Sequence, residues 1–311
     1  MSGQPKASRF SLMWLVILAV PLMEIGYHWK VQLEVPSEND WRHAAAVIEK
    51  QHKEGDLVVI TPWWATEGWV HLGRFMTIEQ MAREDDRGWG RIWEVAWKAR
   101  GREDLEETGK LLAEQKAGRL KVRLWSFPDA PDNIFDFVGA LENGSVAMTD
   151  HRGDSPKPCT FKKHAKHMQS DASAVQTGKF MCNPARSWNY VAREVIADLE
   201  NKPRLCIWAH PVSGERIRIR FDDVPGGAFI EGHTGLKYEA DRETANKPPV
   251  FLDIFAGDAL VGSAMHEEGG GWTHYKFPVP SDWHGGSVSF EVHSPNDGMQ
   301  HFCFTGKLRD K

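Results

Sequence analysis

The chain has 311 residues, a hydrophobic content of 41%, a charged content of 26% and a net charge of −5 at pH 7. These values are typical of a folded chain with room for two domains, and they exclude a wholly disordered protein. The negative charge excludes the basic footprint of a protein that binds nucleic acid, so we predict no nucleic-acid partner.

The N-terminal segment carries an uncharged, mainly apolar run from Phe10 to Met23, which follows Lys6 and Arg9. Basic flanks stay in the cytoplasm, so the residues beyond the run are expected outside it. The run is short for a membrane span, which needs about 20 residues, but no small-residue cleavage site follows it. We predict an uncleaved membrane anchor over residues 1–30; a cleaved signal peptide and a buried core helix are the alternatives.

The sequence pattern of residues 39–150 alternates between helix and strand. A helix beginning at Asn39 or Asp40 and a second at Arg102–Gln115 accompany four short apolar strands, at Leu57–Ile60, Ile92–Trp97, Val122–Trp125 and Ser145–Met148. Strands that alternate with helices favour a parallel sheet with crossover helices. We therefore predict a Rossmann-like α/β domain.

The remaining chain changes character twice. Residues 151–187 contain several Pro, Gly and Ser residues and a Lys/His cluster, which predicts an irregular connecting segment. Residues 188–311 carry about seven short apolar runs separated by turn residues. From Arg216 to Phe221, arginine alternates with Ile or Phe, the pattern of a half-buried strand. An all-β domain, a jelly-roll-like β-sandwich, is the prediction for this part.

The four cysteines predict two disulfides, because an even number in an oxidising compartment is usually paired. Of the three possible pairings, we favour Cys159 with Cys182 and Cys206 with Cys303. Free buried thiols are the alternative for the second pair, since both of its members lie in apolar runs.

A metal site is a further possibility at the first cysteine pair. Cys159, His164, His167 and Cys182 form a C-x4-H-x2-H-x14-C pattern of zinc-ligand types. The spacing matches no common zinc finger, and disulfide formation competes for both cysteines. We therefore predict no cofactor or metal, and we expect the two histidines in a solvated basic loop.

Acid–base chemistry is weakly indicated at two places. Glu67 and His71 have the spacing that places both on one face of a helix. Glu84 begins a Glu-Asp-Asp run that can bind a cation or transfer protons, although a solvated loop explains it better. The chain has no G-x-S-x-G, Walker, zincin or c-type haem motif, so those enzyme classes lose support.

Aromatic residues near polar loops indicate sugar binding, because an indole or phenol ring stacks on the apolar face of a sugar. Trp272, Tyr275 and Trp283 lie in or beside glycine-rich loops of the predicted β-sandwich. Trp63 and Trp64 follow the first predicted strand at its C-terminal end, where open parallel sheets bind ligands. In each case the alternative is that the rings only cover or fill the core.

Several blocks resemble the extracytoplasmic region of multi-pass, polyprenol-phosphate-dependent glycosyltransferases related to protein mannosyltransferases. In the first half these are GDLVVITPWW (Gly55–Trp64), after Asp40-Trp41, and RGWGRIWEVAW (Arg87–Trp97). The C-terminal blocks, similar to the β-domain of some bacterial members, are Asn189–Leu199, Arg204–Pro211, His266–Phe277 and His301–Phe304. The resemblance covers most of residues 40–308, but this chain has at most one membrane segment. It therefore implies the soluble part of such an enzyme without its catalytic membrane domain.

These observations together predict a membrane-tethered accessory protein whose soluble part is periplasmic or at the cell surface. It would bind a glycan or a glycosyltransferase partner in envelope glycan transfer, without catalysing a reaction itself. One alternative is a hydrolase or transferase that acts on saccharides with carboxylates near Glu67 or Glu84. The other is a purely structural envelope protein.

Overall fold

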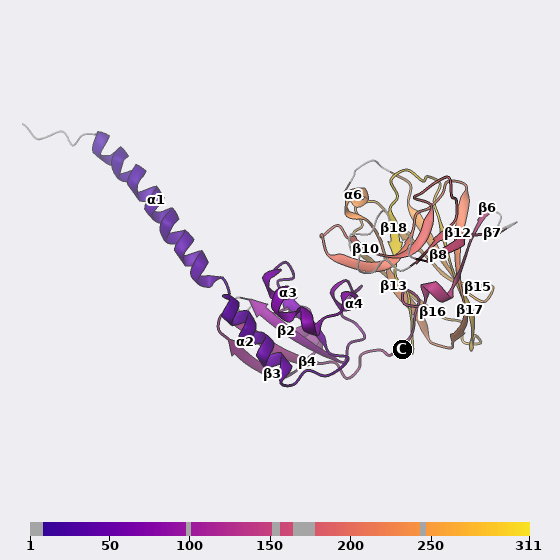
Figure 1. Cartoon of the computed structure of the whole chain (residues 1–311), viewed down its shortest axis with the longest axis horizontal. Helices are drawn as coiled ribbons and strands as arrows, with labels where there is room; N and C mark the ends of the chain where they lie inside the picture. The colour runs from indigo at the N-terminus through magenta and orange to yellow at the C-terminus, as the bar shows by residue number, and fades with distance from the viewer. Residues whose placement is uncertain (1–8, 98–100, 151–155, 164–177, 243–246) are drawn as a thin grey trace, which may run out of the picture. The chain divides into compact units, whose positions relative to one another are not determined.

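The computed structural model describes residues 9–97, 101–150, 156–163, 178–242 and 247–311 (Figure 1). The chain divides into two compact units. Unit 1 comprises Met1–Phe75 and Trp89–Pro128, and unit 2 comprises Met76–Gly88 and Asp129–Lys311. Each unit is described separately below.

The described helices are α1 (Arg9–Glu34), α2 (Glu38–Glu49), α3 (Glu67–Leu72), α4 (Ile78–Met81), α5 (Glu103–Thr108) and α6 (Tyr238–Asp241), with 3₁₀ turns η1 (Gly73–Phe75) and η2 (Leu141–Asn143). The strands of unit 1 are β1 (Leu57–Thr61), β2 (Arg91–Trp97), β3 (Lys110–Ala117) and β4 (Leu120–Ser126). The strands of unit 2 are β5 (Asn133–Asp136), β6 (Ser145–Asp150), β7 (Lys157–Pro158), β8 (Thr160–Lys163), β9 (Gly178–Met181), β10 (Tyr190–Ala197), β11 (Pro203–Ala209), β12 (Glu215–Pro225), β13 (Phe229–Leu236), β14 (Val250–Ala256), β15 (Ala259–His266), β16 (Thr273–Pro278), β17 (Gly285–His293), β18 (Phe302–Phe304) and β19 (Lys307–Arg309).

The first helix corrects the predicted membrane anchor. α1 contains the apolar run but continues through Glu24, Lys30 and Glu34. Charged residues inside a span are costly, and they lower the apolar content of this helix. Among the described residues, no helix is both long enough and apolar enough to cross a membrane. The transmembrane part of the predicted fold is therefore wrong.

The core of unit 1 is a four-stranded sheet with α2 packed on it. α2 begins earlier than predicted, because Ser37 and Asp40 form a reciprocal capping box at its first turn. Its apolar side buries Trp41 and Ile48. Gly55 ends the preceding turn with a φ of +87°, and β1 follows as the buried strand that its apolar run predicts.

The sheet of unit 1 is not the predicted parallel, Rossmann-like sheet. Its strand order is β1-β2-β4-β3; β1 pairs in parallel with β2, whereas β2 with β4 and β3 with β4 are antiparallel. The predicted crossover helix over Arg102–Gln115 forms only as the short α5, and the chain then continues as β3. A two-residue turn with Gly118 at a φ of +60° joins β3 to β4 as a hairpin. The hairpin replaces the crossover that a parallel pair requires.

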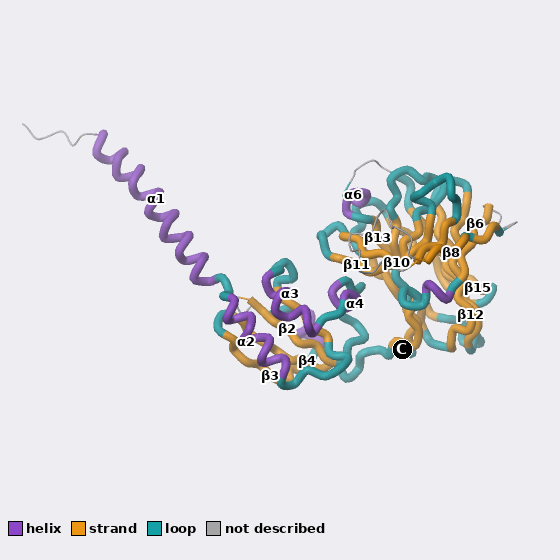
Figure 2. Tube along the Cα trace, viewed as in Figure 1, coloured by secondary structure: helices purple, strands orange, loops and turns teal. Residues whose placement is uncertain are grey.

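Unit 2 is a β-sandwich, as predicted for the C-terminal part, and strands dominate it (Figure 2). One sheet has the order β5-β19-β13-β18-β11-β10-β9-β8, with β16 also paired to β13; the other has the order β15-β14-β17-β12-β6-β7. Side chains of both sheets fill one core, including Val191 and Ile207 from the first and Ile217, Ile219 and Phe290 from the second.

Three further segments lie where the sequence did not place them. The strand predicted at Ser145–Met148 forms as β6, but it pairs with β12 in the sandwich and not with the sheet of unit 1. The predicted irregular segment 151–187 supplies β7, β8 and β9 among its described residues. Residues 76–88, predicted inside the α/β domain, belong to unit 2. Sheet membership depends on contacts between distant residues, which local patterns do not report.

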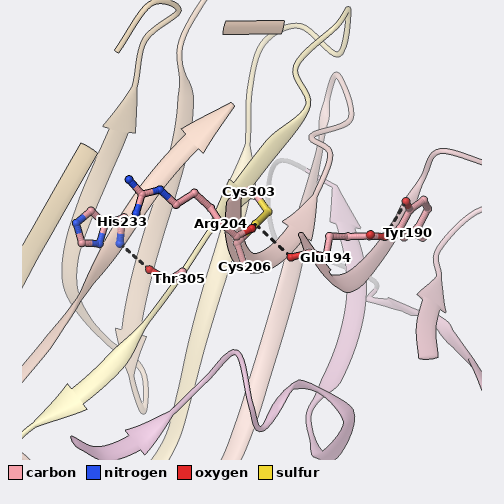
Figure 3. Close-up of a disulfide and its surroundings, with 7 residues drawn as sticks. All are labelled: Tyr190, Glu194, Arg204, Cys206, His233, Cys303 and Thr305. Carbon is pink, nitrogen blue, oxygen red and sulfur yellow. Dashed lines mark hydrogen bonds between the residues drawn. A yellow bond between two sulfur atoms is a disulfide. The ribbon is translucent and has the colours of Figure 1, made fainter. Parts of the chain in front are cut away.

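Both predicted disulfides are present. Cys159 bonds to Cys182 with a Cα–Cα distance of 4.2 Å, and Cys206 bonds to Cys303 with a Cα–Cα distance of 5.8 Å. The second bond joins neighbouring strands of the first sheet, because β11 pairs with β18 and Trp208 lies opposite Cys303. Figure 3 shows this disulfide with Glu194 and Tyr190 on one side and Arg204 and His233 on the other.

Candidate functional site

The turn that follows β1 presents two neighbouring indole rings to solvent. A cis peptide bond joins Thr61 to Pro62, and the next two side chains, Trp63 and Trp64, are 37% and 55% exposed. The turn closes through a hydrogen bond from the Ala65 backbone N–H to the Pro62 carbonyl oxygen, 3.0 Å long. Exposed tryptophan is unusual in a folded chain, because a large apolar ring gains free energy by leaving water.

A third tryptophan supports this turn. The ring of Trp97 meets the ring of Trp64 edge-on, with the centroids 5.5 Å apart. The indole N–H of Trp97 donates to the carbonyl oxygen of Glu34 at 2.9 Å, which fixes its orientation. The sequence analysis did not select Trp97 as a site residue. The available signal was that Trp97 ends the second predicted strand, because the C-terminal ends of parallel strands meet at one edge of a sheet; β1 and β2 do pair in parallel.

The predicted acid–base pair is not assembled beside this turn. Glu67 lies exposed in the first turn of α3, and His71 lies half-buried in its last turn. No hydrogen bond or ion pair connects the two side chains in the described part of the chain. The position of α3 depends on packing. α3 packs closely on α2 at Gly68, where any side chain would collide with Trp41.

Glu84 was expected in a solvated loop, but it is a buried residue of unit 2. Its Oε1 lies 2.6 Å from Nζ of Lys307, and its Oε2 lies 3.8 Å from Nδ1 of His233. Burial raises the pKa of Glu84, but the neighbouring His233 and the charge of Lys307 outweigh burial and hold the pKa well below its usual range. A carboxylate fixed in this way stays ionised at neutral pH and is a poor proton donor.

The residues around Glu84 explain why segment 76–88 belongs to the sandwich. Arg204 donates from Nη1 to the carbonyl oxygens of Arg83 and Glu84, at 3.0 and 2.8 Å. The indole N–H of Trp272 also donates to the Glu84 carbonyl oxygen, at 3.1 Å. These bonds satisfy the buried backbone of the segment, so the cluster is a structural clamp.

The three aromatic residues predicted to bind sugar in the sandwich do not form one platform. Tyr275 is buried, and its hydroxyl donates to the Thr305 carbonyl oxygen at 2.6 Å. Trp272 is half-buried and stacks on His233, with the ring centroids 5.7 Å apart. Trp283 is half-buried against the sandwich core, beyond the opposite end of β16. The two indoles therefore have different surroundings, Trp272 on His233 and Trp283 against the sandwich core.

The alternative metal motif lacks its thiolates. Cys159 and Cys182 are joined in a disulfide, and a disulfide sulfur is not the thiolate that zinc binds. His164 and His167 lie outside the described residues.

The comparisons with known proteins identify no family. No protein-family model matches the chain, and no curated protein matches it. The chain is similar to the CBM51-2 and INT domains of Clostridium perfringens ZmpB, at 9% identity and a TM-score of 0.29 over 52% of this chain and 32% of that one. With GlcNAc bound, the same domains give 10% identity and a TM-score of 0.30 over 66% and 41%.

A third similar structure is CBM27-1 of Caldicellulosiruptor saccharolyticus in complex with mannohexaose, at 13% identity and a TM-score of 0.27 over 53% of this chain and 96% of that one. The match spans less than half the length of the two C. perfringens chains. Similarities of this size do not assign a function to this chain. The resemblance to membrane glycosyltransferases stays a prediction.

Proposed function

We propose that this protein binds glycans outside the cytoplasm and that the Trp63–Trp64 turn holds the sugar. The observation that supports the proposal is the exposure of two neighbouring indoles on a turn that a third indole, Trp97, braces. Sugar rings have apolar C–H faces that stack on such rings, and a braced ring loses little freedom on binding.

The disulfides support the extracytoplasmic part of the proposal. Disulfides persist in oxidising compartments and are rare in the cytosol, and the described cysteines are all paired. The basic flank before the apolar N-terminal run points in the same direction.

An accessory role without catalysis fits the side chains better than the hydrolase or transferase alternative. Glu84 is committed to Lys307, and Glu67 is not paired with His71. The chain resembles only the soluble region of membrane glycosyltransferases. This resemblance suggests that the glycan is bound during transfer in the cell envelope, next to a partner that supplies the catalytic membrane domain.

The test is electrophoresis of the full chain through native gels that contain mannan, galactan or glycol chitin. We expect retardation by at least one polymer. Trp64→Ala should weaken that binding at least about fivefold, because a stacked ring contributes about 1–3 kcal/mol. Val70→Ala is the matched control, since Val70 is an exposed apolar residue on the next helix, and it should leave binding unchanged.

Three results would contradict the proposal. Migration unaffected by all three polymers would favour the structural envelope protein. Equal retardation of Trp63→Ala, Trp64→Ala and the parent chain would remove the turn as the site. Release of new reducing ends during incubation with a polymer would favour the hydrolase.

A further inference from the structure

The outer face of the six-stranded sheet carries a row of arginines. Strand β12 alternates as predicted: its apolar residues enter the core, so Arg216, Arg218 and Arg220 project from the other face. On the neighbouring strands the same face carries Asp253 of β14 and Glu291 of β17, which lie opposite one another in the ladder.

The carboxylates of this face lie beneath the arginines. Nη1 of Arg216 is 3.0 Å from Oδ2 of Asp253 and 3.1 Å from Oε2 of Glu291. Nε of Arg218 is 2.6 Å from Oε1 of Glu291. The Glu291 side chain is only 4% exposed, whereas the side chains of Arg218 and Arg220 are 43% and 48% exposed. The face therefore exposes the guanidinium groups of Arg218 and Arg220, with Glu291 buried beneath Arg218 and the exposed Asp222 beside Arg220.

The arginines are held in place but keep unused donors. A guanidinium has five N–H donors in a planar fork. In the described part of the chain, Arg218 directs both Nε and Nη2 toward Oε1 of Glu291, and Arg220 directs Nε toward Asp222 at 2.9 Å. Among these contacts, Nη1 of Arg218 and the two Nη groups of Arg220 remain for a ligand. Because Glu291 and Asp222 already orient the two side chains, binding loses less rotamer entropy than it would with free arginines.

We infer that this row binds the oxyanion groups of an acidic saccharide. Guanidinium forks bind carboxylate and sulfate oxygens in pairs, and two residues spaced by two along a strand lie about 7 Å apart on one face. The inference rests on the proposed function, since it names the class of glycan. It concerns a second surface, on unit 2, whereas the Trp63–Trp64 turn belongs to unit 1.

The net charge of the chain makes this surface testable. At −5, the whole protein repels polyanions at long range, so retention by a polyanion reports a local cationic site. Native gels are run with polygalacturonate, dextran sulfate or neutral dextran. The comparison distinguishes binding to carboxylate or sulfate groups from binding to the sugar backbone alone. We expect the full chain to be retarded by one of the acidic polymers, and by dextran less.

The variants are chosen to keep the fold. Arg218→Gln and Arg220→Gln leave Arg216 to neutralise Glu291 and Asp253, and each should weaken acidic-polymer binding at least about tenfold, the value of one charge-assisted contact. Arg218→Lys keeps the charge but loses the fork, so its effect should be intermediate. Arg186→Gln is the matched control, because the Arg186 side chain is 47% exposed on the same unit and also lies beside an aspartate.

The outcomes separate the inference from the proposed function. Retardation by neutral polymers with no preference for acidic ones overturns the inference and leaves the Trp63–Trp64 site standing. Acidic binding that Arg186→Gln weakens as much as Arg218→Gln overturns it as well, and so does equal retardation by single-stranded DNA. Acidic binding lost in Arg218→Gln but kept in Trp64→Ala establishes the second surface. Absence of binding to every polymer contradicts both proposals.

Discussion

Glu84 and Lys307 form an ion pair that attaches segment 76–88 to the last strand of the sandwich, with Nζ and Oε1 2.6 Å apart. The Glu84 side chain is buried, and the Lys307 side chain is mostly buried. Breaking a buried pair by removing one charge is costly, because the partner charge is then left without compensation.

The first prediction follows from this pair. Glu84→Gln should lower the free energy of unfolding by about 3 kcal/mol, measured by urea denaturation at pH 7. Glu79→Gln is the control, since Glu79 pairs with Arg193 but is largely exposed, and it should change the stability by less than about 1 kcal/mol. Equal effects of the two substitutions would contradict the assignment of Glu84 as the clamp.

The same pair gives the direction of its pH dependence. The pKa of Glu84 is lowered on folding, so its stabilising effect is complete above its ordinary pKa near 4.5 and is lost as the pH falls below that value. The stability difference between the parent chain and Glu84→Gln should therefore shrink on acidification from pH 5 downwards. A difference that grows on acidification would contradict this sign.

The second prediction concerns His210. Burial lowers the pKa of His210 from 6.5 to about 4, and the Nδ1–H of the neutral ring donates to the Pro211 carbonyl oxygen at 2.9 Å. The unfolded chain binds a proton that the folded chain resists, so stability should fall as the pH drops from about 6.5 to about 4, by at most about 3 kcal/mol. Melting temperatures across this range should depend less on pH in His210→Asn than in the control His284→Asn, whose histidine is exposed.

The third prediction ranks the two disulfides. Cys206 and Cys303 are 97 residues apart in sequence, whereas Cys159 and Cys182 are 23 apart. Closing the longer loop restricts the unfolded chain more. Loss of the Cys206–Cys303 bond should therefore cost about 5 kcal/mol, and loss of the Cys159–Cys182 bond about 3 kcal/mol. Urea unfolding of the two double Cys→Ser variants measures this order, and the reverse order would contradict the loop-entropy explanation.

The fourth prediction tests the hairpin that replaced the expected crossover. Gly118 has a φ of +60°, and a Cβ there would collide with Oδ1 of Asp40, whose carboxylate accepts from the Ser37 backbone N–H in the capping box of α2. Gly55 has a φ of +87°, but a Cβ there would meet nothing within 4 Å. Gly55→Ala should therefore cost only the left-handed backbone, about 1 kcal/mol.

Gly118→Ala should cost that amount and, in addition, about 1 kcal/mol for the displaced helix cap. Thermal unfolding of the two variants, followed by circular dichroism, gives the difference. Equal melting temperatures would show that Asp40 moves aside at no cost and that the cap contributes nothing.

Local sequence patterns correctly predicted those strands whose position and buried face depend on residues close together in the sequence. The alternation of Arg216–Phe221 gave the buried face of β12, and the apolar run Leu57–Ile60 gave β1. The predicted helix over Arg102–Gln115 was wrong beyond Thr108, because the following residues favour a helix in isolation while Gly118 permits the hairpin that pairs them with β4. Tertiary contacts decide such cases.

The site was only partly predictable for the same reason. Trp63 and Trp64 were selected from their place at the end of a strand, but exposure, which separates a sugar platform from core filling, is a property of the folded chain. Tyr275 and Trp272 were selected in the same way, from their place beside a polar loop. In the structure, however, they donate hydrogen bonds to the carbonyl oxygens of Thr305 and Glu84. The arginine row was visible in the sequence, yet the depth of Glu291 beneath it was not.

The membership of segment 76–88 in unit 2 affects how the protein can be divided. The polypeptide crosses between the units at three places, after Phe75, after Gly88 and after Pro128, so no single cleavage separates them. A fragment that starts at Asp129 would lose the carboxylate facing Lys307 and the backbone oxygens that bind Arg204 and the Trp272 indole. Recovering a stable sandwich by itself would require adding residues 76–88 back, as a separate peptide or as a circular permutation.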